Sequence, residues 1–318
     1  MITLFGRRAA AFVLGATVLL VACAGNGGPS APAEPNVARA ATTTTSPVSL
    51  ALRLCNGKKP KRIGTIKDPA IVEASGVVQS RRHPGVLWVH NDSGDTARVF
   101  AITKKGVALR QYTLTGAGAV DWEDIAISAG SNGAPDTLYL GDIGDNNSVR
   151  NNINVYAIPE PDPAHDTSAA APQVEPLLYP DGAHNAEAMF VDPASRDLFI
   201  VTKEFSGDSR VYRKQGGLLS GQPTLSLVAN LSLGGGELVT AGDISPDGSA
   251  IVLRTYGAVF VWSRKPGEDI ATAFTRPPCH APSPAEQQGE AISIDPNGLG
   301  YVTTSEGVHA PIRHVNAG

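Results

Sequence analysis

Charged residues, cysteines and long apolar runs are all scarce in this chain of 318 residues. Charged residues make up 18% of the chain and its net charge is −4, so the charge balance gives no reason to expect a nucleic-acid partner. The chain contains no Gly-x-Ser-x-Gly elbow and no Gly-Lys-Ser/Thr phosphate loop, which leaves any catalytic residue unassigned. No convincing amphipathic helix is visible. Short β-rich runs alternate with Gly, Asp, Asn and Pro turns, which favours an all-β fold.

The N-terminus has the order of features expected of an exported protein. Arg7 and Arg8 precede an apolar run at residues 9–20, which is too short for a membrane span. The Leu-Val-Ala-Cys motif that ends at Cys23 resembles the lipobox of bacterial lipoproteins. That resemblance implies an acylated Cys23 and a protein anchored to the outer face of the cell membrane, where several acyl chains hold stably. An ordinary signal peptide with a chance cysteine is the alternative.

Composition divides the chain into three parts. Residues 1–22 are expected to be the signal peptide. Residues 23–49 are rich in Ala, Pro, Gly, Thr and Ser and cannot bury a core, so a flexible tether is expected there. Residues 50–318 are long enough for one sizeable domain.

Five related segments recur in that domain at a spacing of roughly fifty residues, a size that suits a four-stranded propeller blade. The segments begin at Glu73, Glu123, Glu187, Gly242 and Glu290. Each continues into a second and a third β-rich run, and the first four continue into a fourth. Residues 61–66 precede the first segment and are expected to supply the missing outer strand of the last blade, which closes the ring. The sequence therefore predicts a five-bladed β-propeller. A sixth blade, hidden at residues 157–179 or near the N-terminus, and a β-sandwich are the alternatives.

In a propeller, the start of each first strand and the end of each second strand lie on one face. That geometry predicts a ring of acids at one mouth of the central channel, supplied by Glu73, Glu123, Glu187, Asp243 and Glu290, and their repulsion favours a cation. All-oxygen ligands suit Ca²⁺ better than zinc. The expected metal ligands are Glu73, Glu123, Asp142, Glu187 and Glu290. The expected ligand-binding residues are Asn91, Asp92, Asp121, Lys203, Arg254 and Glu306.

Two other interpretations of these polar residues stay open. Asp, Asn and Glu at such positions also serve turns and bond backbone amides, so a purely structural ring is possible. Lys203 and Arg254, placed at similar blade positions, either hold an anionic substrate or neutralise neighbouring Glu side chains, and the second is favoured. Trp88, Trp122 and Trp262 are expected to pack within the blades.

Two cysteines remain besides Cys23. Export permits a disulfide, and the even pair of Cys55 and Cys279 suggests one, with two free thiols as the alternative. Such a bridge would tie the N-terminal segment to the body of the propeller.

Four motifs carry a resemblance that spans nearly the whole domain. Residues 73–76, 89–95, 121–126 and 141–146 resemble those of secreted bacterial β-propeller lipoproteins, a mostly uncharacterised group. More distantly, the Glu-initiated strands are similar to those of propeller phytases and calcium-dependent lactonase-type propellers. That similarity implies a Ca²⁺-dependent hydrolase of a phosphoester or lactone, although those folds usually have six blades. A non-catalytic module that binds an envelope ligand or a protein partner through the same face is the alternative function.

Overall fold

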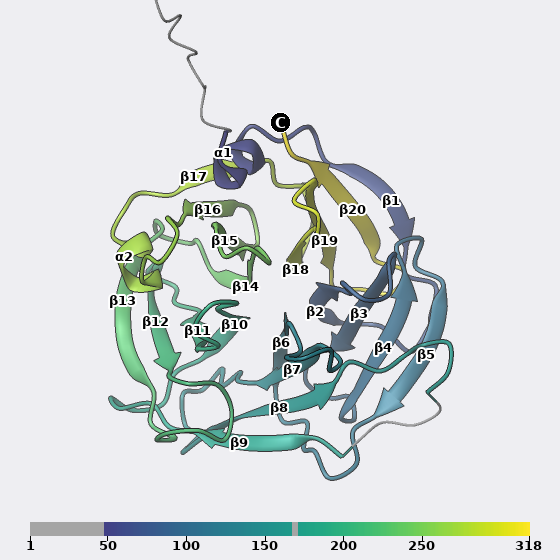
Figure 1. Cartoon of the computed structure of the whole chain (residues 1–318), viewed down its shortest axis with the longest axis horizontal. Helices are drawn as coiled ribbons and strands as arrows, with labels where there is room; N and C mark the ends of the chain where they lie inside the picture. Colours follow the sequence, from purple (N-terminus) through teal and green to yellow (C-terminus); the bar gives the residue numbers. More distant parts are fainter. Residues whose placement is uncertain (1–47, 167–170) are drawn as a thin grey trace, which may run out of the picture. The chain divides into compact units, whose positions relative to one another are not determined.

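The computed structural model describes residues 48–166 and 171–318, which lie in one unit, Pro47–Gly318. Cys23, the signal peptide and residues 23–47 of the tether lie outside the described residues, so the expectations about them stay predictions. Within the described residues, twenty strands form five antiparallel sheets of four strands each. Figure 1 shows these sheets arranged around a centre as a five-bladed β-propeller, which confirms the predicted fold.

Each blade runs from an inner strand at the channel to an outer strand. Blade 1 contains β2 (Ala74–Gln79), β3 (Val86–Asn91), β4 (Arg98–Thr103) and β5 (Ala108–Thr113). Blade 2 contains β6 (Trp122–Ser128), β7 (Thr137–Asp142), β8 (Ile153–Pro159) and β9 (Gln173–Leu177). Blade 3 contains β10 (Ala186–Val191), β11 (Leu198–Thr202), β12 (Asp208–Lys214) and β13 (Ser226–Ser232). Blade 4 contains β14 (Val239–Ile244), β15 (Ala250–Thr255), β16 (Val259–Ser263) and β17 (Cys279–Ala281). Blade 5 contains β18 (Gly289–Ile294), β19 (Gly300–Ser305), β20 (Pro311–Asn316) and β1 (Lys61–Thr65).

Blade 5 is assembled from distant parts of the sequence. Strand β1 pairs antiparallel with β20, in a register that places Lys61 opposite His314. The predicted closing strand is therefore confirmed, and blade 5 gains the outer strand that its own segment lacks. Strand β9 is the outer strand of blade 2, so residues 157–179 add no sixth blade within the described part of the chain.

Burial decreases from the inner strands to the outer strands. All six residues of β2 are buried, whereas β5 exposes four of its six residues. Strands that are covered on both faces favour β-branched and aromatic side chains, as in Val-Leu-Trp-Val at the start of β3. Trp88, Trp122 and Trp262 are each at most 2% exposed and lie in the clusters between neighbouring blades, as expected.

Polar side chains connect the inner strands of different blades deep in the channel. The carboxylate of Asp124 on β6 accepts the N–H of Ile125 at 2.9 Å, of Met189 on β10 at 2.8 Å and of Gly242 on β14 at 3.0 Å. One buried carboxylate therefore joins blades 2, 3 and 4. Asp243 joins blades 4 and 5, because it accepts the N–H of Ile294 at 2.8 Å.

Every inner strand begins with the same irregularity. The pairing of each inner strand with the second strand of its blade shifts by one residue near its start, which marks a β-bulge. The residues at the five bulges, here named the bulge ring, are Ser75, Glu123, Glu187, Thr240 and Glu290. Three of them are the expected glutamates. The sequence alignment was wrong in blades 1 and 4, because Glu73 precedes the bulge of blade 1 by two residues and Asp243 follows that of blade 4 by three.

Two short helices, α1 (Leu50–Cys55) and α2 (Ile270–Phe274), occur where the sequence predicted none. Ser49 caps α1 and Asp269 caps α2 through bonds from backbone amides, which stabilises such short helices. Helix α1 packs against β16 and β17, and a disulfide joins Cys55 to Cys279 with their Cα atoms 6.1 Å apart. The predicted bridge is confirmed. No helix among the described residues is both long and apolar enough to cross a membrane.

Candidate functional site

Two sets of equivalent residues surround the end of the channel at which the inner strands begin. One set is the bulge ring. The second, here named the post-strand ring, consists of the residues that directly follow the second strands: Asp92, Ile143, Lys203, Tyr256 and Glu306. We call this end of the channel the acidic mouth, because three members of the first ring and two of the second are acids.

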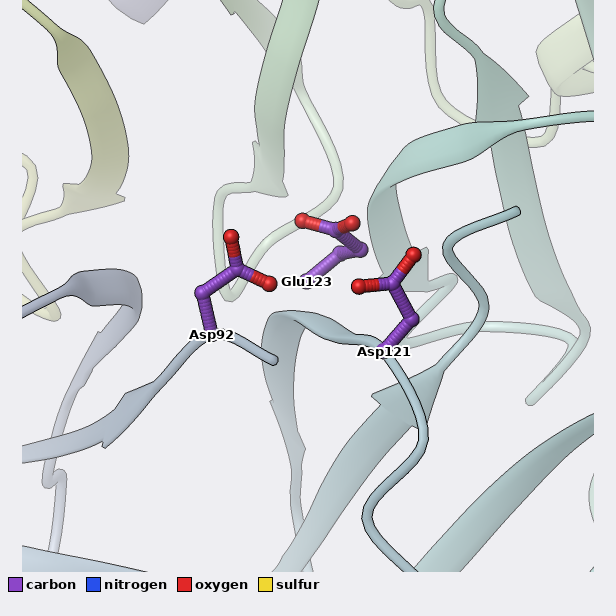
Figure 2. A group of neighbouring side chains, drawn as sticks. All are labelled: Asp92, Asp121 and Glu123. Atoms are coloured by element: carbon purple, nitrogen blue, oxygen red, sulfur yellow. The ribbon is translucent and has the colours of Figure 1, made fainter. Parts of the chain in front are cut away.

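Three carboxylates meet on one side of the acidic mouth (Figure 2). Asp92, Asp121 and Glu123 each offer an oxygen atom, and these oxygens lie within 4.8 Å of one another. Ligands placed 2.3–2.6 Å from one Ca²⁺ lie at most about 5 Å apart, so a single ion can contact all three. We name these residues the metal group. The sequence analysis placed Glu123 among the metal ligands but assigned Asp92 and Asp121 to ligand binding.

The backbone around the metal group holds each acid in place. The N–H of Asp92 donates to the carbonyl of Glu73 at 2.8 Å. The N–H of Asp121 donates to Oδ1 of Asp142 at 3.0 Å, and Ser75 Oγ donates to the carbonyl of Glu123 at 2.6 Å. The three acids therefore come from blades 1 and 2, and contacts within and between those blades position them.

Gly144 leaves space beside the metal group. A Cβ at this position would overlap Glu123 Oε1 and Asp121 Oδ2, while the N–H of Gly144 donates to the carbonyl of Asp121 at 3.1 Å. Gly144 belongs to a run at residues 141–146 that the sequence analysis singled out only as a resemblance. Nothing in the sequence shows that this glycine faces two carboxylates.

Burial and mutual repulsion disfavour the charged forms of these acids. Burial, with the neighbouring charge of Asp92, raises the pKa of Asp121 to about 6. Burial also raises the pKa of Glu123 well above its ordinary value, and the charges of Glu187, Asp92 and Asp121 add to the effect. The group can hold a metal ion, because a bound cation would remove both the repulsion and the need for protons.

Two of the expected site residues, Asp142 and Asn91, accept hydrogen bonds from the backbone next to the metal group. Asp142 is fully buried, and its Oδ1 accepts the N–H of Asp121 and Nη1 of Arg150, the latter at 2.8 Å. Its Oδ2 has no hydrogen-bond partner within the described residues. Asn91 Oδ1 accepts the N–H groups of Val72 at 3.0 Å and Glu73 at 3.2 Å, so this side chain fixes the loop that leads into blade 1.

The side of the acidic mouth that blades 3 to 5 form contains a lysine among the acids. Lys203 Nζ lies 2.6 Å from both carboxylate oxygens of Glu187 and donates to Tyr256 Oη at 2.8 Å. Burial raises the pKa of Glu187 to about 7 against the opposing effect of Lys203. Burial, with the charges of Glu187 and Glu306, raises the pKa of Glu290 to about 8. Burial and the charge of Glu73 also raise the pKa of Glu306.

Arg254 does not occupy the blade position of Lys203. Lys203 directly follows β11, and the residue that directly follows β15 is Tyr256, two residues after Arg254. The guanidinium of Arg254 is fully buried, pairs with Glu286 and donates to the carbonyls of Ala291 at 2.8 Å and Thr304 at 3.0 Å. The expected equivalence was therefore wrong, because it ignored where β15 ends. The sequence analysis missed Tyr256, because only the end of β15 in the structure shows that Tyr256 is the equivalent of Lys203.

A cavity of about 490 Å³ opens beside Lys203. Its lining is Asn146, Ser148, Asn185, Lys203, Glu204, Phe205, Leu238 and Tyr256. Asn185 connects the cavity to the acids, since its Nδ2 lies 3.4 Å from Glu187 Oε1. The volume falls within the range of small-molecule sites, roughly 300–1,000 Å³.

Comparison with known proteins supports the fold only. No protein-family model and no curated protein matches the chain. Among solved structures, a glucose dehydrogenase matches with a TM-score of 0.50 and 8% identity over 82% of this chain and 100% of that one. A nidogen/laminin complex matches with a TM-score of 0.44 and 15% identity, over 74% of this chain and 73% of that one. The hydrazine synthase of Kuenenia stuttgartiensis matches with a TM-score of 0.38 and 13% identity, over 76% and 57%.

Proposed function

We propose that this protein is an envelope-anchored β-propeller that binds one Ca²⁺ between Asp92, Asp121 and Glu123 and uses it to hydrolyse a phosphoester or a lactone. The observation that carries the proposal is the convergence of three acids from blades 1 and 2 beside a glycine that leaves them room. Their ligand atoms are all oxygens, which Ca²⁺ prefers.

The proposed reaction uses the coordination positions that the protein leaves free. Ca²⁺ takes 6–8 oxygen ligands, so three carboxylates leave room for water and for a substrate oxygen. A divalent ion held by these three acids would polarise a phosphoryl or carbonyl oxygen and would favour attack by water. The cavity beside Lys203 offers space for the rest of a small substrate. Glu187 and Glu290 can exchange protons near neutral pH, because burial raises the pKa of the first to about 7 and of the second to about 8.

Calcium titration of the purified full-length chain, after removal of divalent ions, tests the binding step. We expect one Ca²⁺ per chain and a loss of affinity of at least about a hundredfold in Glu123→Gln, which keeps the shape but removes a charged ligand. Asp247→Asn is the matched control, because Asp247 lies in the turn between β14 and β15 at the opposite end of the channel. Wild-type protein that binds no Ca²⁺ would disprove the proposal.

Turnover of a generic aryl phosphate and of a generic lactone, measured as Ca²⁺ is restored, tests the chemical step. Hydrolysis that appears with Ca²⁺ and disappears in Glu123→Gln supports the enzyme. Calcium binding without turnover of either substrate would favour a non-catalytic module that binds an envelope ligand or a protein partner at the same mouth.

Membrane anchoring is a separate part of the proposal and depends on Cys23. Incorporation of labelled palmitate by the producing bacterium, and recovery of the chain in the membrane fraction, are the expected results. Cys23→Ser should abolish both. A wild-type chain that is secreted without label would rule out the anchor and leave the calcium site untouched.

A further inference from the structure

Lys203 lies among the acids of the mouth as a partly buried cation. Its side chain is 14% exposed, and its ammonium contacts both oxygens of Glu187 at 2.6 Å. The ammonium also lies 4.8 Å from the centre of the Tyr256 ring, which adds a cation–π contact. Burial of the ammonium opposes its charge, yet the pair with Glu187 keeps the pKa of Lys203 above its ordinary value. Lys203 is therefore charged at neutral pH.

The charge of Lys203 acts on the acids of both sides of the mouth. Burial raises the pKa of Asp92 and Glu123 in the metal group and of Glu187, Glu290 and Glu306 across from it, and the charge of Lys203 opposes that rise in all five acids. The two nearby arginines have other partners. Arg150 is held by Asp142 and the carbonyl of Gly144, and Arg254 is held by Glu286.

The two rings explain why the sides of the mouth differ. Blade 1 places Asp92 at its post-strand position, and this acid joins Glu123 of the next blade in the metal group. Blade 3 places Lys203 at the same position, and the ammonium pairs with Glu187 of its own blade. Lys203 thus places a positive charge on one side of the mouth, at the same post-strand position from which Asp92, on the other side, offers a carboxylate to a metal.

We propose that Lys203 is the built-in counter-cation for Glu187, Glu290 and Glu306, and that it limits the acidic mouth to one divalent ion. This inference rests on the proposed calcium site. Without the ammonium, Glu187 and Glu290 of the bulge ring and Glu306 of the post-strand ring would lose their fixed counter-charge, and such acids repel one another until a cation binds. With the ammonium present, a second divalent ion would meet a fixed positive charge and lose Glu187 as a free ligand.

Calcium titration of Lys203→Met measures the effect directly. Methionine keeps the unbranched side chain as far as the ε position and removes the ammonium with its charge. We expect two Ca²⁺ per chain in place of one, and a first Ca²⁺ bound about tenfold more tightly, because the repulsion from the ammonium is gone. Lys203→Arg keeps the charge and should still bind one. The control is Lys214→Met, since Lys214 is also a buried lysine of blade 3 and pairs with Glu175 at 3.2 Å away from the channel.

A second pair of variants keeps the inference testable if Lys203→Met does not fold. Glu187→Gln leaves the ammonium unpaired, so the first Ca²⁺ should bind about tenfold more weakly. Adding Lys203→Met to Glu187→Gln should restore wild-type affinity within about threefold, because the net charge of the mouth is then unchanged. If Glu187 were itself a ligand of the first ion, the double variant would stay weak, and the inference would fail.

The results also separate this inference from the proposed function. Wild-type protein without any calcium binding would disprove the function, whereas a Ca²⁺ gained in Lys203→Met and lost in the double variant would still support Lys203 as the counter-cation. One Ca²⁺ of unchanged affinity in Lys203→Met, with Glu187→Gln also unchanged, would overturn the inference and leave the function standing.

Discussion

Buried carboxylates lie at two depths of the channel, and their hydrogen-bond partners distinguish them. Asp124, deep between the blades, accepts three backbone N–H groups. Glu123, its neighbour in sequence, faces Asp92 and Asp121 at the mouth and accepts only a long hydrogen bond of 3.4 Å from Ser75 Oγ within the described residues. Burial raises the pKa of both groups well above the ordinary values. The pKa therefore does not separate a structural acid from a candidate metal ligand, whereas the hydrogen-bond partners do.

Replacement of Asp124 should have the largest effect on stability. Asp124→Ala leaves the N–H groups of Ile125, Met189 and Gly242 without their acceptor and should lower the free energy of unfolding by about 3–5 kcal/mol. Chemical denaturation in the presence and absence of Ca²⁺ measures it. Asp124→Asn keeps one acceptor oxygen and should lose less. A loss below about 1 kcal/mol in Asp124→Ala would show that the deep carboxylate does not join the blades.

Replacement of Glu123 should act in the opposite direction when metal is absent. Glu123→Gln removes one of several facing charges and should raise the free energy of unfolding of the calcium-free protein by about 1–2 kcal/mol. Added Ca²⁺ should then give no further stabilisation, although it should stabilise the wild type. A lower free energy of unfolding in calcium-free Glu123→Gln would show that Glu123, like Asp124, stabilises the fold, and would contradict the distinction between the two acids.

Filling the space at Gly144 should weaken the binding of Ca²⁺ more than it lowers the stability of the fold. Gly144→Ala places a methyl group against Glu123 and Asp121, so one carboxylate must move and the affinity for Ca²⁺ should fall about tenfold. Calorimetric titration measures the affinity, and thermal unfolding without Ca²⁺ provides the control. Equal affinity in the variant and the wild type would place the ion elsewhere in the mouth.

The pH dependence of stability should give the smallest effect. Because the folded protein raises the pKa of Asp121 to about 6 and of Glu290 to about 8, it binds protons more tightly than the unfolded chain does. That stabilisation is complete below the ordinary pKa values near 4 and is lost as the pH rises through 6 to 8. The melting temperature of the calcium-free protein should fall by about 2–4 °C over this window, and saturating Ca²⁺ should remove the part of the decline that Asp121 contributes. A rise over the same window would show that the acids are stabilised as anions without metal.

The repeat in the sequence predicted the blades, and blades 2, 3 and 5 also revealed their mouth residues. Glu123, Glu187 and Glu290 are recognisable because a glutamate stands at each bulge. Blades 1 and 4 have Ser75 and Thr240 at the bulge. The sequence analysis therefore took the nearest acids, Glu73 and Asp243, as the mouth residues of these two blades. A bulge shifts strand register by one residue, and single-sequence patterns do not show where that shift occurs.

The metal group was harder to predict than the strands, because it depends on loops. Asp92 follows β3 and Asp121 precedes β6, and their approach is fixed by backbone contacts to Glu73 and Asp142. Hydrophobic periodicity says nothing about such contacts. Asp124 stands one residue from Glu123, and only the positions of β10 and β14 show that it belongs to the channel interior.

The pairing of β1 with β20 also sets an order on folding. Strand β1 is the first of the described strands to be made and its partner β20 is the last, so the ring stays open until the other strands have emerged. Such distant pairing slows folding and leaves an unpaired strand edge in the meantime. The Cys55–Cys279 bond can form only after Cys279 has appeared, and it then keeps the early segment beside the blades that complete the circle.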